Sequence, residues 1–455
     1  MVIKEGFVVT PRGVLKTDVL IQNGVVAGMG ENLSDGEALD AGGKYVLPGG
    51  IDVHTHMDLD AGAARAQDDF YTGTVAAACG GTTTIVDHPG FGPAGCGLEH
   101  QIDKYHALAE GKAVIDYSFH GVIQHVDGDV LAKMKTLVED GITSFKIYMT
   151  YDYKINDGDV YTLLKRAKEL GVLIAVHPEN DGMVTRRRAE LPAGGYTAPI
   201  YHERSRPVEC EAEAVNRVCM LSAVAGDAPL YIVHLSNHLG MVYIRMAKEN
   251  GLKNVFVETC PQYLTLDESL YLRDDGVKFI LSPPLRDKSN IALLWEDIGK
   301  GWIDTLATDH CPFDYSLKRK LGGADFTKCP NGLPGVELRF PLAFSEGVLK
   351  KRISPVRFAD LCAAKPAKLF GMYPKKGVIA PGSDADITII DPNARHTVRH
   401  ADLHENVDFT PYEGMELLCR VDTVLSRGDV IVRGNKYIGE KGRGRFIKRS
   451  KPILG

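Results

Sequence analysis

The chain has 455 residues, of which 44% are hydrophobic and 25% charged, and its formal net charge at pH 7 is −6. This length exceeds the usual size of one domain, so we expect one large domain and a smaller one. The negative charge argues against a nucleic-acid partner, and no apolar run is long enough for a membrane span. Nine scattered cysteines favour reduced thiols. Because the first residues show no signal-peptide pattern, we expect a cytoplasmic protein.

Both ends of the chain predict β-structure. Short strands are expected at 7–10, 18–21 and 25–27, and Asn23-Gly24 between the last two is a strong hairpin signal. Further strands are expected near the other end, at 385–390, 421–425 and 429–432. We interpret residues 1–50 and 372–455 as one discontinuous β-sandwich domain; two separate caps are the alternative.

The middle of the chain alternates strand-like apolar runs with segments of helical length. The eight expected strands cover 51–56, 82–88, 114–122, 144–151, 173–177, 230–235, 255–259 and 303–309. This alternation predicts an α/β fold with a (β/α)8 TIM barrel over residues 51–371. No glycine-rich phosphate loop follows the first strand, which counts against a nicotinamide- or phosphate-binding fold. Ser354-Pro355 is expected to open the helix that closes the barrel.

The first barrel strand carries His54 and His56, whose side chains leave the strand on the same face. Such a pair is a weak metal signal alone. Four further strands end in residues that a metal site needs, namely Lys146, His177, His234 and Asp309. Because carboxyl ends of barrel strands converge on one mouth, we expect all six side chains to meet there.

These six residues allow a site for two divalent ions. His54 and His56 with Asp309 would hold one ion, and His177 with His234 the other. The ligand types suit zinc, with manganese, cobalt or iron as alternatives. Two close dications need an anionic bridge, which Lys146 would provide after reaction with carbon dioxide or bicarbonate to N6-carboxylysine.

Each residue also has a simpler explanation. Lys146 alone could be a salt-bridged or Schiff-base lysine, and His177 or His234 a core histidine with satisfied nitrogens. Asp309 could simply cap the next helix. These would be independent accidents, and their occurrence one per strand end is far less probable than a single metal site.

The sequence resembles the amidohydrolase superfamily, and within it the hydantoinase and dihydropyrimidinase branch. The resemblance spans essentially the whole chain. It rests on these motifs: Pro48 to His56, Gly80 to Thr84, Ser144-Phe145-Lys146, His177 to Asn180, Glu258 to Leu264, Ser282 to Arg286, Thr308-Asp309-His310 and Asn331 to Gly335. Asp68-Asp69-Phe70 and Ser118 to Ile123 are most similar to the bacterial phenylhydantoinase type.

The resemblance implies hydrolysis of a small cyclic ureide or imide by a metal-bridging hydroxide. It assigns Asp309 the transfer of a proton to the leaving nitrogen, and Tyr151 a hydrogen bond to the developing oxyanion. Ser282 and Asn331 match positions whose main chain holds the amide edges of the ring; without the resemblance they would be turn residues. A homotetramer, or alternatively a homodimer, is also implied.

Substrate preference depends on the loop after His56. Dihydroorotases carry an arginine there for a substrate carboxylate, whereas this chain has Asp58 and Asp60, which disfavours a carboxylated ring. The loop continues with small residues to Arg65, so we expect room for a bulky, aromatic 5-substituent unless Arg65 folds inward.

Three rival functions remain open. A dihydropyrimidinase and an allantoinase-like cyclic amidase would differ in substrate alone. A non-catalytic scaffold of the same fold is disfavoured because all six ligand positions are kept. The basic tail at 439–451 is expected to be a solvated or subunit-packing extension rather than a site for an acidic partner.

Overall fold

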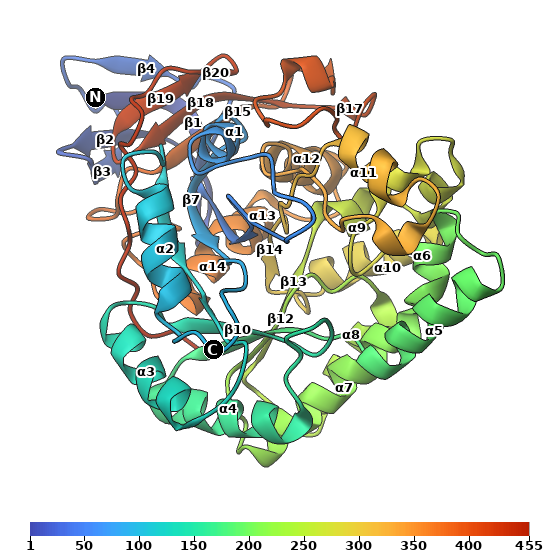
Figure 1. Cartoon of the computed structure of the whole chain (residues 1–455). Helices are drawn as coiled ribbons and strands as arrows, with labels where there is room; N and C mark the ends of the chain where they lie inside the picture. The colour runs from blue at the N-terminus through green and yellow to red at the C-terminus, as the bar shows by residue number, and fades with distance from the viewer. Residues whose placement is uncertain (455) are drawn as a thin grey trace.

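Strands from the two ends of the chain lie in one sheet of the computed structural model, which describes residues 1–454 (Figure 1). The sheet has nine strands in the order β20-β19-β18-β15-β5-β1-β2-β3, with β4 beside β1. The bounds are β1 Val2–Thr10, β2 Gly13–Gln22, β3 Val25–Gly30, β4 Ala38–Asp40, β5 Tyr45–Pro48, β15 Ile387–Asp391, β18 Arg420–Ser426, β19 Asp429–Arg433 and β20 Lys436–Tyr437. Both chain ends therefore build one β unit, as the sequence predicts, and two separate caps are excluded.

The turn between β2 and β3 shows why this sheet forms where it does. Asn23 and Gly24 have φ angles of 52° and 78°, which an Asn-Gly pair tolerates and most residues do not. Apolar side chains of the sheet, among them Val8, Val19 and Ile387, form a hydrophobic cluster separate from that of the barrel. The exact domain boundaries, 1–50 with 372–455 and 51–371, remain a prediction.

The barrel consists of parallel strands arranged in two sheets, β6-β7-β8 and β14-β13-β12-β11-β10-β9. Their bounds are β6 Gly50–Thr55, β7 Thr82–Asp87, β8 Asp116–Phe119, β9 Gly121–Val122, β10 Ser144–Tyr148, β11 Leu173–His177, β12 Leu230–Ile232, β13 Val255–Thr259 and β14 Thr305–Leu306. The strand expected at 114–122 is divided at His120 into β8 and β9, so the eight-strand count holds. Main-chain hydrogen bonds from Asp309 to His54 (2.8 Å) and from His56 to His310 (2.9 Å) close the ring.

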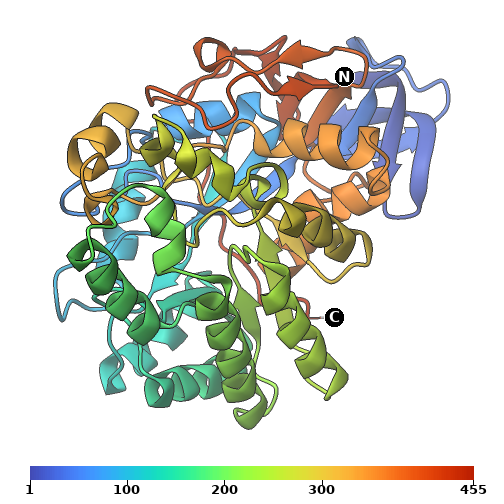
Figure 2. The same cartoon turned by 90° about the vertical axis from the view of Figure 1, so that its right-hand side faces the viewer.

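Helices surround the barrel strands, as Figure 2 shows for the side formed by residues from about 200 to 300. The longer ones are α1 Thr72–Cys79, α2 His100–Ala109, α3 Gly128–Glu139, α4 Asp157–Leu170, α5 Asp181–Ala193, α7 Val208–Val224, α8 His238–Glu249, α10 Lys288–Gly299 and α11 Tyr315–Gly322. Their starts follow local chemistry: Asn156 and Asn237 accept hydrogen bonds from first-turn N–H groups of α4 and α8. Among residues 1–454, no helix is long and apolar enough to cross a bilayer.

The closing helix begins as predicted, with Ser354 accepting from the N–H of Arg357 at the start of α13 (Pro355–Ala359). It continues through a π-helical turn into α14 (Lys365–Leu369). The tail was expected to be solvated or to pack on another subunit. Lys441, Lys448 and Lys451 are exposed, but Arg449 is buried against the barrel of its own chain.

Candidate metal centre

One cavity of about 670 Å³ lies at the carboxyl ends of the barrel strands. All nine residues singled out from the sequence line it: His54, His56, Lys146, Tyr151, His177, His234, Ser282, Asp309 and Asn331. They come from segments up to 277 positions apart, between positions 54 and 331. The fold thus brings the whole predicted set together, and the roles of its members remain predictions.

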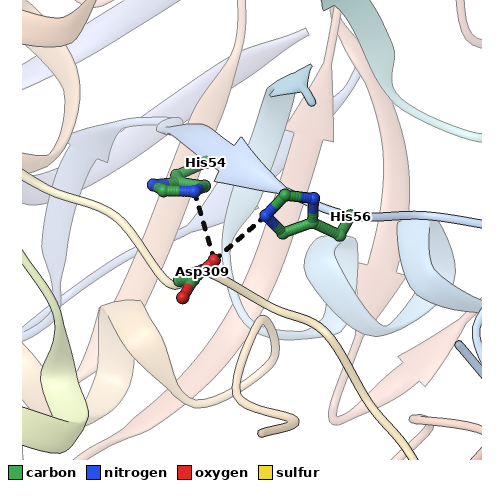
Figure 3. A group of neighbouring side chains, drawn as sticks. All are labelled: His54, His56 and Asp309. Atoms are coloured by element: carbon green, nitrogen blue, oxygen red, sulfur yellow. Dashed lines mark ion pairs between the residues drawn. The ribbon is translucent and has the colours of Figure 1, made fainter. Parts of the chain in front are cut away.

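His54, His56 and Asp309 form the tightest part of the cluster (Figure 3). The Nε2 atoms of both histidines lie 3.1 Å from the same oxygen of Asp309, Oδ1. Burial acts to lower the pKa of His54, but the Glu258 and Asp309 carboxylates raise it to about 9. Two imidazole nitrogens and one carboxylate oxygen therefore converge on a point that stabilises positive charge, which fits a divalent cation.

His177 and His234 supply a second pair of imidazoles beside the first. Their ring centroids are 4.5 Å apart, and the rings of His234 and His54 are 5.4 Å apart. Nδ1 of His234 is buried without a hydrogen-bond partner among the described residues. An unpaired buried nitrogen is costly unless a ligand occupies it, so this atom also fits a metal ligand.

Lys146 lies on β10 with 1% of its surface exposed. Within residues 1–454, its ammonium has no hydrogen-bond acceptor, and it lies 5.1 Å from the centre of the Tyr148 ring. Burial lowers the pKa of Lys146 to about 8. The side chain lines the cavity, where an ammonium would repel two bound cations, whereas a carbamate would place negative charge where they need it.

Two carboxylates behind the histidines were not identified as functional from the sequence. Glu258 accepts a hydrogen bond from Nδ1 of His54 at 2.6 Å, and Glu179 accepts one from Nε2 of His177 at 2.7 Å. Each bond fixes which ring nitrogen is left for the cavity: Nε2 of His54 and Nδ1 of His177. Arg206 in turn pairs with Glu179. Both acids belong to motifs that carry the family resemblance. The only sign of their role in the sequence is their position at or just after the ends of barrel strands.

We expect Glu258→Gln to weaken metal binding by about 10–100-fold, the usual effect of removing a carboxylate that orients a histidine ligand. Glutamine keeps the size and can still accept from the main-chain N–H of His234 (2.8 Å). Metal affinity measured by competition with a chelator tests this. Asp297→Asn is the matched control, because Asp297 accepts from His238 at the same 2.6 Å but on α10, outside the cavity. Unchanged affinity in Glu258→Gln would contradict a ligand role for His54.

Three residues at the mouth have left-handed backbone conformations: Tyr151 (φ 74°), His234 (φ 39°) and Asp309 (φ 55°). This conformation costs about 1–3 kcal/mol for residues other than glycine and is typical of functional sites. A residue in this region cannot continue a strand, so the strands expected at 144–151, 230–235 and 303–309 cannot include these residues; β10, β12 and β14 end two or three residues before them.

A second group of acids, Asp116, Asp384 and Asp386, is close enough for a cation site. The ammonium of Lys376 already fills it, at 2.8 Å, 3.1 Å and 2.6 Å from the three carboxylates. Arg427 adds a further contact with Asp116. The two basic side chains neutralise these acids and join the barrel to the nine-stranded sheet. The cluster therefore needs no metal ion, and the proposed metal site is the one at the barrel mouth.

Comparison with known proteins agrees with this geometry. The sequence profile of the amidohydrolase family matches residues 45–431. The chain is 53% identical to D-phenylhydantoinase of Escherichia coli O81 (strain ED1a), covering 100% of this chain and 99% of that protein. Solved structures with similar folds include a dihydropyrimidinase from Brevibacillus agri NCHU1002, with a TM-score of 0.96 and 45% identity over 99% of both chains.

A solved structure with lower sequence identity also matches over nearly the whole chain. The L-hydantoinase from Arthrobacter aurescens superimposes with a TM-score of 0.90 and 31% identity, covering 98% of this chain and 99% of that one. These matches extend over the barrel and the nine-stranded sheet together, so they confirm the α/β class, the TIM barrel and the sheet from both chain ends. The chain belongs to the amidohydrolase family, as a hydrolase of its hydantoinase type.

Proposed function

We propose that this protein opens the ring of 5-monosubstituted hydantoins, preferably with an aromatic substituent, to give N-carbamoyl amino acids. The observation that carries the proposal is the convergence of the nine residues on one cavity, among them a buried Lys146 with no hydrogen-bond acceptor among the described residues. The likeness to D-phenylhydantoinase supports the substrate class. Dihydropyrimidinase activity is the second candidate, supported by the likeness to the Brevibacillus agri protein.

The proposed cofactors are two divalent ions, zinc in the first place and manganese, cobalt or iron as alternatives. His54, His56 and Asp309 would hold one ion and His177 and His234 the other, and carboxylated Lys146 would supply negative charge to both. When bound, the ions activate a water molecule and polarise the ring carbonyl. The homotetramer and the cytoplasmic location expected from the sequence stay predictions.

The side chains at the mouth divide the remaining work. Asp309 accepts a proton from the attacking water and returns it to the ring nitrogen when the C–N bond breaks. Tyr151 donates its hydroxyl hydrogen to the carbonyl oxygen as negative charge develops there; burial raises its pKa to about 12, so it remains a donor at neutral pH. Main-chain groups of Ser282 and Asn331 hold the amide edges of the ring.

The cavity wall explains the preference for an aromatic substituent. Leu59, Phe91 and Tyr153 line the cavity, and the rings of Phe91 and Tyr153 are 4.7 Å apart. Arg65, which would spoil this pocket by folding inward, pairs with Asp58 at 2.9 Å and is 63% exposed. Leu59, Phe91 and Tyr153 together offer the apolar and aromatic contacts that suit a flat aromatic ring.

The test is the ratio of kcat/KM for 5-phenylhydantoin and dihydrouracil, with protein loaded with metal in bicarbonate. A ratio strongly favouring the phenyl compound supports the proposal. A ratio favouring dihydrouracil moves the assignment to dihydropyrimidinase, and activity on allantoin alone to an allantoinase. Protein that retains almost no metal would instead favour the non-catalytic scaffold.

A further inference from the structure

The tail of the chain fills a gap in the barrel wall. Among the described strands, β8 pairs with β7 alone, and pairing to β10 starts only with β9, at Gly121 opposite Phe145 and Val122 opposite Lys146. Along the N-terminal part of β10, the barrel wall therefore has no strand-to-strand pairing with β8. The tail that leaves the nine-stranded sheet in Figure 1 ends beside this part of the barrel.

Main-chain hydrogen bonds place the tail in that gap. The N–H of Tyr117 on β8 donates to Arg445 (3.0 Å), and the N–H of Ile447 donates back to Tyr117 (2.7 Å). On the other side, the N–H of Arg449 donates to Gly141, three residues before β10 begins (3.0 Å). The tail thus acts as a short strand between β8 and the start of β10.

Arg449 connects the two sides of the gap through its side chain. Its guanidinium donates to Ser118 Oγ (2.9 Å) and the Phe119 carbonyl (2.6 Å) on β8, and to Ser144 Oγ (3.0 Å) on β10. The residue is 3% exposed and has no carboxylate partner among the described residues. Burying a cation without a carboxylate partner is unfavourable, so these three hydrogen bonds are needed to offset the cost.

Arg449 also orders a chain of hydrogen bonds that ends beside the metal centre. His120 Nε2 lies 2.9 Å from the Val53 carbonyl, which can only accept, so this nitrogen carries the proton. Nδ1 of His120 must then accept from Ser144 Oγ (2.7 Å), and the Ser144 oxygen accepts from Arg449. The donor and the acceptor of each hydrogen bond in this series are therefore fixed, from Arg449 through Ser144 and His120 to Val53.

Both ends of this hydrogen-bond series lie next to residues proposed to bind metal. Val53 precedes His54, and Ser144 lies two residues before Lys146 on the same face of β10. Ring contacts connect the same residues: His120 stacks on His88 with ring centres 3.9 Å apart, and His88 meets His54 edge-on at 4.3 Å. A shift of β10 or of the His120 ring would therefore displace the groups proposed to bind metal.

We propose that Arg449 is a positioning residue for the metal centre, which fixes β10 and the His120 ring so that Lys146 and His54 meet the same pair of ions. This inference rests on the proposed roles of those two residues. It differs from a purely structural role of the tail, which would alter stability without altering metal binding.

The experiment compares full-length wild type with Arg449→Met and Ser144→Ala. Each protein is equilibrated with zinc at buffered free concentrations in ¹³C-bicarbonate, and bound metal, the ¹³C carbamate signal and Tm are measured. We expect Arg449→Met to weaken binding of zinc by about 10-fold or more, with a matching loss of carbamate signal. Ser144→Ala removes the hydrogen bond to His120 and keeps the bonds of Arg449 to β8, and we expect the same loss of zinc and carbamate. It keeps the test possible if Arg449→Met does not fold.

Arg443→Met is the matched control, because Arg443 also anchors the tail, through the Ser426 carbonyl (2.8 Å) and Asp429 (3.0 Å), without touching β10. It should lower Tm and keep metal and carbamate. The positioning role would be overturned if wild type, Arg449→Met and Ser144→Ala all bound zinc with equal affinity and gave equal carbamate signals. Wild type without a second ion or carbamate would instead refute the proposed function.

Discussion

Lys146→Met is expected to abolish the carbamate, reduce the bound metal and lower kcat/KM by about 10³-fold, which corresponds to about 4 kcal/mol of transition-state stabilisation. Methionine has nearly the same length and fills the same buried space, so the barrel should still fold. It cannot react with carbon dioxide. The variant therefore removes the proposed anionic bridge and leaves the four histidines and Asp309 in place.

The pKa of Lys146 makes carbamate formation feasible near neutral pH. Carbon dioxide reacts with the neutral amine, and with a pKa of about 8 about half of the side chain is neutral at pH 8, against about 0.3% for an ordinary lysine. Since the lowered pKa favours the neutral form as pH rises, reconstitution at a fixed concentration of dissolved carbon dioxide should accelerate from pH 6 to 8 and level off above that range.

A second buried lysine provides an internal control. Burial also lowers the pKa of Lys318 to about 8. Its side chain, however, donates to the carbonyls of Lys278 (2.9 Å), Ile280 (2.7 Å) and Gly332 (2.5 Å) and does not line the cavity, so no metal ion would stabilise a carbamate there. Wild type should therefore show one ¹³C carbamate per chain, and Lys146→Met none. A carbamate that persists in Lys146→Met, or full metal content without one, would contradict the bridging role.

Much of this site was predictable because its geometry follows from local rules. Alternation along a strand places His54 and His56 on one face, and a parallel barrel brings strand ends such as Lys146 and Asp309 to one mouth. Both rules need only the period of the sequence and the assignment of strands. The hairpin of β2 and β3 was predictable for a similar reason, since Asn23-Gly24 fixes it locally, whereas the pairing of β5 with β15 joins distant parts of the chain.

The remaining features depend on contacts that no local rule predicts. Glu258 meets His54 across 204 positions, and Arg449 meets Ser144 across 305. A buried arginine in a basic tail looks like any exposed one in the sequence, so the sequence does not reveal the burial of Arg449. The left-handed turns at His234 and Asp309 were also missed, because neither residue type demands that conformation.

Asp309→Asn is expected to lower kcat by about 10²–10⁴-fold at saturating metal, the range for loss of a positioned general acid or base. Burial acts to raise the pKa of Asp309, but His54 and His56 hold it well below the usual value. The carboxylate is therefore ionised at neutral pH and able to accept a proton. Asparagine keeps the size and tolerates the left-handed conformation (φ 55°), so the change removes charge and basicity with little backbone strain.

The same variant separates the two proposed roles of Asp309. Loss of a ligand weakens metal binding and is offset by excess metal, whereas loss of the proton acceptor is not; the deficit in kcat should therefore persist when metal content equals that of wild type. Asp304→Asn is the control, because Asp304 adjoins β14, accepts from the N–H of Val257 (2.9 Å) and pairs with Lys365 (3.3 Å) away from the cavity. It should change Tm and leave kcat within a few-fold of wild type. If excess metal restored Asp309→Asn to wild-type kcat, Asp309 would act as a ligand alone, and the proton transfer would belong to another group at the mouth.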